Sequence, residues 1–281
     1  MRRLLLCTDL DRTLIPNGDA PESAGARPAF RRLVARDDVT LAYVSGRHQA
    51  LIAEAVSAYG LPLPDFAIAD VGATIYACDA GEWHRDRAWD DHIGCDWNGA
   101  TGERLHDLLR DLSSLSLQEP ERQGRHKLSY THRGVARPDA VLGTVRERLA
   151  AAGFPSNVIW SVDPEAGVGL VDVLPRRANK RHAIAFLASR GGFGSGDVLF
   201  AGDSGNDLDV LLSPYPAVLV ANADADVRRR ARQASPRENI YFARGGRFGM
   251  NGNYGAGILE GVAHFVPELG AWLERMLAEE E

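Results

Sequence analysis

The chain has 281 residues, of which 45% are hydrophobic and 25% are charged. This composition is typical of a globular protein, and the length suits one large domain or two. The formal net charge is −6 and the basic runs are short and scattered, which argues against a nucleic-acid binder because such proteins normally carry a basic patch. The sequence has no apolar run of the roughly 18 residues that a membrane-spanning helix needs and no signal-peptide core.

The three cysteines, Cys7, Cys78 and Cys95, show no C-x-x-C spacing and no disulfide framework. Cys7 and Cys78 lie within apolar runs, where a free cysteine behaves as a small hydrophobic residue. Because disulfides are rare in reducing compartments, this pattern indicates an intracellular protein. Together with the charge and the lack of a long apolar run, it predicts a soluble, cytoplasmic protein with neither a membrane nor a nucleic acid as partner.

The first predicted element is a buried strand over residues 4–7, a short apolar run that is followed by Asp9, Asp11 and Thr13. Residues i and i+2 of an extended chain point to the same side, so both carboxylates can face one site. Two negative charges at such a short distance repel each other unless a cation or a shared proton reduces the repulsion. Taken alone, the pair fits either a solvated acidic loop or a cation site.

Strands and helices then alternate, which is the pattern of a parallel, doubly wound α/β sheet. The predicted strands are residues 39–44 and 66–69, with a hairpin-like element at residues 74–78. The predicted helices are residues 24–36 and 48–59.

The pattern changes near residue 83, where three tryptophans appear among polar residues. The helices predicted in this region are residues 101–115 and 139–152, and the strands are residues 126–132 and 157–162. A smaller α+β module inserted into the sheet domain explains the change. The expected domains are a discontinuous core of residues 1–82 and 169–281, and an insert of residues 83–168.

After the insert the alternation resumes. The predicted strands are residues 169–174, 198–201, 217–220 and 239–242, and the helices are residues 179–189, 224–233, a segment from residue 207 onward and one or two helices at the end of the chain. A glycine-rich segment at residues 245–257 fits either a loop that closes over a site or an ordinary connection.

Chemically active side chains recur at the ends of the predicted strands, at the carboxyl edge where open α/β sheets bind ligands. They are Asp9, Asp11 and Thr13 after the first strand, Ser45 after the second, Lys180 at a helix start, and Asp203 and Asp207 after a later strand. Carboxylates suit Mg²⁺, which prefers hard oxygen ligands, while lysine and serine can bind a phosphoryl group. A carboxylate can also attack phosphorus and form an aspartyl phosphate.

Four segments together resemble the motifs of the haloacid dehalogenase superfamily, in the same order. They are D-L-D-R-T at residues 9–13, Ser45-Gly46, Lys180, and G-D-S-G-N-D at residues 202–207. The insert resembles the type C2 (C2B) cap of the sugar-phosphatase branch. Within that branch, residues 71–73, 123–130 and 253–265 are most similar to sucrose-phosphate phosphatases. The implied fold is a Rossmann-like α/β core with an inserted α+β cap.

The resemblance implies a role for each matching residue. Asp9 would be the nucleophile, and Asp11 would be the general acid and base. The implied Mg²⁺ ligands are Asp9, Asp11 through its backbone carbonyl, Asp203 and Asp207. The implied substrate-binding residues are Thr13, Ser45, Gly46, Lys180 and Asn206 in the core motifs, and Gln123, Lys127 and Ser129 in the cap. Arg12 stands where the family usually has a small or amide residue. Its side chain could reach substrate or face solvent, and we expect it to face solvent.

The implied function is a Mg²⁺-dependent phosphomonoesterase that acts on a phosphorylated disaccharide, with sucrose 6-phosphate as the leading candidate. Another sugar phosphate, such as mannosylfructose phosphate or a hexose or amino-sugar phosphate, is the alternative within the same chemistry. A sugar-phosphate synthase is a candidate partner. A non-catalytic accessory subunit of a glycosyltransferase is the alternative from another class. A nucleotide-binding Rossmann domain is disfavoured because no G-x-G-x-x-G follows the first strand.

Overall fold

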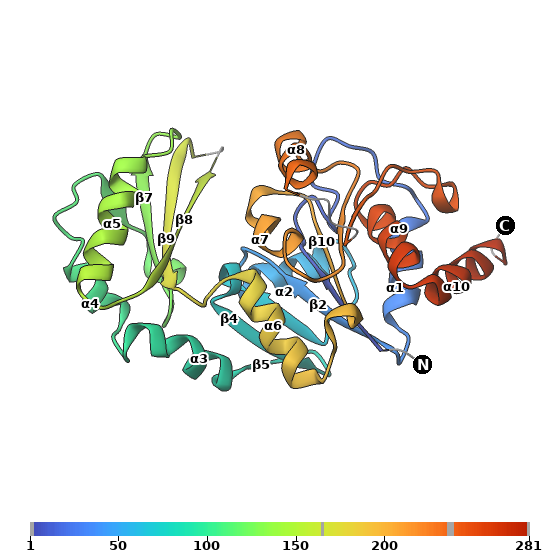
Figure 1. The fold of residues 1–281 in the computed structure, drawn as a ribbon, viewed down its shortest axis with the longest axis horizontal. Coiled ribbons are helices and arrows are strands. Elements are labelled where there is room, and N and C mark those ends of the chain that lie inside the picture. Colours follow the sequence, from blue (N-terminus) through green and yellow to red (C-terminus); the bar gives the residue numbers. More distant parts are fainter. Residues whose placement is uncertain (1–2, 164–165, 235–238, 280–281) are drawn as a thin grey trace. The chain divides into compact units, whose positions relative to one another are not determined.

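The computed structural model describes residues 3–163, 166–234 and 239–279. It divides into two compact units (Figure 1). The first unit comprises Met1–Ala69, Tyr76–His84 and Ile184–Glu281, and the second comprises Asp70–Ile75 and Arg85–Ala183. Residues 1–2, 164–165, 235–238 and 280–281, which the predicted domain ranges include, lie outside the described residues.

The larger sheet has eight strands in the order β12-β11-β10-β1-β2-β3-β4-β5. The strands are β1 (Leu4–Thr8), β2 (Val39–Val44), β3 (Phe66–Ala69), β4 (Thr74–Asp79), β5 (Glu82–Arg85), β10 (Val198–Gly202), β11 (Ala217–Leu219) and β12 (Ile240–Phe242). The six strands from β12 to β3 pair in parallel. The prediction of a doubly wound parallel sheet is therefore confirmed.

Helices cover this sheet and bury both faces of its central strands, which explains why β1, β2, β10 and β11 are almost entirely apolar. They are α1 (Ala26–Val34), α2 (Gln49–Ala58), α6 (Lys180–Gly191), α7 (Leu208–Leu211), α8 (Ala225–Gln233), α9 (Gly255–Phe265) and α10 (Pro267–Ala278). Every residue of β1 is buried. Leu4 and Leu6 share a core cluster with residues of α1, α9 and α10, and these three helices lie together in Figure 1.

The second unit contains a four-stranded sheet in the order β6-β7-β9-β8, with antiparallel pairing. Its strands are β6 (Leu115–Leu117), β7 (Leu128–Arg133), β8 (Ser156–Asp163) and β9 (Val168–Pro175), and its helices are α3 (Arg87–Gly94), α4 (Gly102–Asp107) and α5 (Asp139–Ala151). Side chains from α4, α5 and the sheet form a separate core cluster around Tyr130 and Val171.

Two sequence predictions in this region are wrong. The strand predicted at residues 169–174 lies in β9 and pairs with β7 and β8, so it belongs to the antiparallel sheet and not to the parallel one. Its sequence is as apolar as that of a strand in the parallel sheet, because Val171, Val173 and Leu174 are all buried. The helix predicted over residues 101–115 ends at Asp107, and tight turns lead from there into β6.

The glycine-rich segment is held in place by Glu260, which is 0% exposed on α9. Its carboxylate accepts hydrogen bonds from the backbone N–H of Gly245 at 2.8 Å, from that of Arg244 at 3.2 Å and from the Tyr241 hydroxyl at 3.2 Å. Gly245 has φ 83°, and a Cβ there would come within 2.7 Å of the Asn251 carbonyl oxygen. The segment is therefore anchored to the first unit by a buried charge.

Replacing Glu260 by alanine is expected to lower the free energy of unfolding by about 1–3 kcal/mol, because buried donors lose their acceptor. Chemical denaturation measures the change. The exposed Glu268 provides the control, since Glu268→Ala should change stability by less than about 0.5 kcal/mol. Equal effects of the two substitutions would contradict the anchoring role of Glu260.

Candidate active site

Three buried carboxylates meet at the carboxyl edge of the parallel sheet. Asp9, Asp203 and Asp207 each offer a ligand atom, and these atoms lie within 4.8 Å of one another. The cluster follows from strand pairing, because β1 and β10 are neighbours in parallel register, with Thr8 opposite Ala201. The exposed fractions of the three residues are 5%, 1% and 0%. Such close, buried negative charges repel strongly unless a cation compensates them.

The turn after β10 fixes this arrangement. Asp207 Oδ2 accepts the backbone N–H of Asp203 at 3.0 Å and that of Ser204 at 3.1 Å. Thr13 donates its hydroxyl to Asp203 Oδ1 at 3.0 Å. The exposed Asn206 accepts a hydrogen bond from the Ser204 hydroxyl at 3.1 Å. Thr13 thus orients a carboxylate, a contact that its motif alone did not indicate.

Asp11 is held apart from the three clustered carboxylates by groups that sequence reasoning missed. Arg47 donates Nη2 to Asp11 Oδ1 at 2.6 Å and Nε to Oδ2 at 2.8 Å, and Asn17 Nδ2 donates to Oδ1 at 2.7 Å. The hydrogen bonds to Asp11 raise the pKa of Arg47 despite partial burial. The signal was present, because Arg47 directly follows the Ser45-Gly46 motif.

Ser45 is fully buried and lies at the end of β2. Its hydroxyl accepts the backbone N–H of Arg47 at 3.1 Å, while Gly46 is exposed. Helix α2 has His48 as its N-cap residue, so Ser45 is not the cap. Lys180 begins α6 in the second unit and is 2% exposed. Burying an ammonium group is costly unless polar or charged partners surround it.

The three cap residues predicted to bind sugar lie close together within the second unit. The Gln123 amide accepts the Ser129 N–H at 2.8 Å and donates to the carbonyl oxygens of Gln118 and Ser129. Ser129 donates its hydroxyl to Asp172 at 2.5 Å. Gln123 therefore holds the loop before β7 in place, and the Ser129 hydroxyl connects β7 to the Asp172 carboxylate.

Lys127 is paired with two carboxylates that the sequence did not single out. Its Nζ lies 3.5 Å from Asp70 Oδ1 and 3.9 Å from Asp172 Oδ1. Asp70 and Val71 both have positive φ, at 53° and 59°. This conformation is costly, above all for a β-branched residue, and such strain is concentrated at functional sites. Lys127, Asp70, Asp172 and Ser129 together offer hydrogen-bond donors and acceptors, a combination suited to binding sugar hydroxyl groups.

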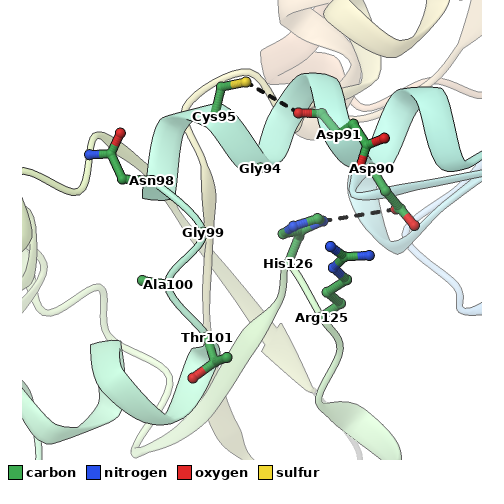
Figure 2. Close-up of a pocket in the computed structure, with 10 residues that line it drawn as sticks. All are labelled: Asp90, Asp91, Gly94, Cys95, Asn98, Gly99, Ala100, Thr101, Arg125 and His126. Atoms are coloured by element: carbon green, nitrogen blue, oxygen red, sulfur yellow. Dashed lines mark hydrogen bonds and ion pairs between the residues drawn. The ribbon is translucent and has the colours of Figure 1, made fainter.

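A pocket of about 570 Å³ in the second unit lies between α3, residues 98–101 and residues 125–126 (Figure 2). His126 Nδ1 faces Asp90 Oδ1 at 3.8 Å, and Arg85 donates two hydrogen bonds to Asp90. Burial would raise the pKa of Asp90, but His126 and Arg85 outweigh it and lower that pKa to about 2. Asp90 is therefore ionised at neutral pH.

The tryptophans near this pocket pack inside the second unit. Trp89 and Trp97 are fully buried, and their indole N–H groups donate to the Gly72 carbonyl oxygen and the Ser156 hydroxyl. These rings stabilise the fold and present no face to a ligand. In the part of the chain that the structure describes, no helix is both long and apolar enough to cross a membrane.

Comparison with known proteins identifies the family. A family model described as sucrose-6F-phosphate phosphohydrolase matches residues 2–266. The chain belongs to this family. It is therefore a sugar phosphatase, a phosphoric monoester hydrolase of the haloacid dehalogenase superfamily.

Individual relatives agree with the assignment. A HAD-like hydrolase of Nitrosococcus oceani is 50% identical over 276 residues, which cover 97% of this chain and 74% of that protein. A mannosylfructose-phosphate phosphatase of Agrobacterium fabrum is 28% identical, covering 93% of this chain and 96% of the relative. The sucrose-phosphatase of Synechocystis, solved with sucrose and phosphate, superimposes with a TM-score of 0.73 and 30% identity over 94% of this chain and 98% of that one.

Replacing Arg47 by lysine tests the clamp on Asp11. Lysine keeps the charge but cannot form the two parallel hydrogen bonds of a guanidinium, so the Asp11 carboxylate should lose its fixed orientation. We expect kcat to fall about ten- to a hundredfold, with a smaller change in KM. Steady-state kinetics on a phosphate ester measure both. The substitution Arg32→Lys at an exposed position provides the control. A wild-type kcat in Arg47→Lys would contradict the expectation that Arg47 orients the Asp11 carboxylate.

Proposed function

We propose that this sugar phosphatase is a Mg²⁺-dependent enzyme that hydrolyses a phosphorylated disaccharide, with sucrose 6-phosphate as its substrate. The proposal rests chiefly on the buried cluster of Asp9, Asp203 and Asp207, whose oxygen donors fit a hard divalent cation. Membership of the family supports a sugar phosphate as the substrate, and the Synechocystis relative was solved with sucrose and phosphate.

Asp9, Asp203, Asp207 and the backbone carbonyl of Asp11 would hold the Mg²⁺ ion. The bound ion would neutralise charge on the transferring phosphoryl group. An Asp9 oxygen attacks phosphorus, so a bond from Asp9 to phosphorus forms as the bond from phosphorus to the sugar oxygen breaks. Ser45 and Lys180 bind the phosphoryl oxygens, which stabilises the charge that these oxygens carry in the transition state.

Asp11 is the proton carrier in this scheme. It donates a proton to the departing sugar oxygen, and later accepts one from the water that attacks phosphorus in the aspartyl phosphate, as the bond from Asp9 to phosphorus breaks and phosphate is released. Arg47 and Asn17 both contact this carboxylate, so they orient it for transfer.

The second unit would supply specificity as a cap. Lys127, Ser129 and the neighbouring Asp172 offer donors and acceptors for sugar hydroxyl groups, and Gln123 braces the loop that carries them. A site built from buried polar groups discriminates well, because a substrate that lacks a matching hydroxyl leaves those groups unpaired.

The substitution Asp9→Asn tests the nucleophile. An amide cannot form the acyl phosphate, so phosphate release should fall below about one-thousandth of the wild-type rate. A colorimetric phosphate assay with Mg²⁺ measures it. The exposed Asp37 gives a matched control, as Asp37→Asn should keep wild-type turnover. Substantial activity in Asp9→Asn would overturn the mechanism.

A substrate panel tests the sugar. Sucrose 6-phosphate, mannosylfructose phosphate, glucose 6-phosphate and glucosamine 6-phosphate are compared by kcat/KM. We expect sucrose 6-phosphate to exceed both monosaccharides by at least about tenfold, because a second ring adds contacts that each contribute about 1 kcal/mol. A higher value for mannosylfructose phosphate would assign that substrate, as the Agrobacterium relative suggests. Equal values throughout would contradict a disaccharide site.

A further inference from the structure

The first unit contains a pocket beside the catalytic aspartates, and none of the roles that the motifs imply uses it. Its volume is about 410 Å³, and it is lined by Arg12, Asn17, Gly18, Asp19, Ala20, Asn222 and Tyr254. Two of its wall residues touch the catalytic carboxylates, because Arg12 Nε lies 3.4 Å from Asp203 Oδ2 and Asn17 donates to Asp11 at 2.7 Å. The pocket therefore adjoins the site where phosphorus would react.

Arg12 is held in an unfavourable conformation at the mouth of this pocket. Its φ is 58°, in the left-handed region that glycine and asparagine adopt more easily. Its backbone is pinned on both sides, because its N–H donates to Asn17 Oδ1 at 2.8 Å and its carbonyl accepts from Asn222 Nδ2 at 2.6 Å. The side chain is 46% exposed, so packing does not explain why an arginine stands here.

Tyr254 forms the buried wall of the same pocket. It is 0% exposed, and its hydroxyl has no hydrogen-bond partner among the described residues. Gly18 makes room beside it, since a Cβ at that position would lie 3.0 Å from the hydroxyl oxygen. A buried hydroxyl without a partner costs stability, whereas phenylalanine would fill the same space at no such cost. The hydroxyl is therefore better explained by a ligand group than by packing.

We propose that Arg12, Asp19 and Tyr254 form a subsite for hydroxyl groups of the substrate's sugar portion. Arg12 would donate, the exposed carboxylate of Asp19 would accept, and the Tyr254 hydroxyl can do either. Of the charged residues that line the pocket, Arg12 is already paired with Asp203 and Asp19 is negative, which favours a neutral polyol over an anion. This subsite rests on the proposed function, since it binds the leaving group of the same reaction.

Two substitutions test the subsite with a matched control. Tyr254→Phe removes only the hydroxyl, and Arg12→Asn substitutes a residue that tolerates the left-handed backbone. Tyr59→Phe alters a tyrosine outside the pocket and serves as the control. For each protein, kcat/KM is measured on sucrose 6-phosphate and on phenyl phosphate, which lacks sugar hydroxyls. Thermal midpoints and calorimetric binding of sucrose are measured alongside.

We expect the ratio of kcat/KM for the sugar phosphate over phenyl phosphate to fall about three- to tenfold in Tyr254→Phe, and at least as far in Arg12→Asn. Taking the ratio cancels any effect of Arg12 on Asp203 that both substrates share. Tyr254→Phe should melt at or above the wild-type temperature, and both variants should bind sucrose more weakly. Tyr59→Phe should change neither the ratio nor sucrose binding.

An unchanged ratio, or a lower melting temperature for Tyr254→Phe, would overturn the subsite. The measurements distinguish a failure of the subsite proposal from a failure of the proposed function. If the wild type hydrolyses sucrose 6-phosphate but the variants keep its ratio and its sucrose affinity, the subsite alone is wrong. If the wild type hydrolyses no sugar phosphate yet binds sucrose more tightly than the variants, the proposed function alone is wrong. If sucrose does not bind to the wild type, the subsite is excluded.

Discussion

The mutual repulsion of three buried carboxylates is the constraint on which the rest of the site depends. Asp9 and Asp203 are brought together because β1 and β10 pair in parallel, and the turn after β10 adds Asp207. The fold supplies partial compensation through the Thr13 hydroxyl, two backbone N–H groups and the Arg12 guanidinium, which lies 3.4 Å from Asp203 Oδ2. One opposing charge does not balance three carboxylates, so the arrangement fits a divalent cation.

The same electrostatics supports the different roles that we propose for Asp9 and Asp11. Asp9 is 5% exposed and belongs to the three clustered carboxylates, whereas the side chain of Asp11 is 38% exposed and paired with Arg47. A carboxylate in a candidate cation site suits the proposed attack on phosphorus, and one held by hydrogen bonds outside that cluster suits the proposed proton transfer. The surroundings of Asp9 and Asp11, which lie two positions apart in the sequence, therefore support different proposed roles.

Much of the core site could be predicted from the sequence, because apolar runs define the strands and parallel topology places the strand ends on one edge. The contacts of the charged partners could not be predicted. Each of these ion pairs joins residues far apart in the sequence: Arg47 contacts Asp11, and Lys127 contacts Asp70 and Asp172. Nothing in the local sequence shows which partner each side chain contacts. The segment at residues 169–174 was misassigned for a related reason, since a central strand of either sheet is apolar in the same way.

The most direct test of the account is a crystal structure of the protein with Mg²⁺ and beryllium fluoride, which mimics a phosphoryl group on a carboxylate. We predict beryllium bonded to an Asp9 oxygen, with Mg²⁺ held by Asp9, Asp203, Asp207 and the Asp11 carbonyl oxygen. Beryllium on another residue, or Mg²⁺ bound away from Asp9, Asp203 and Asp207, would contradict it.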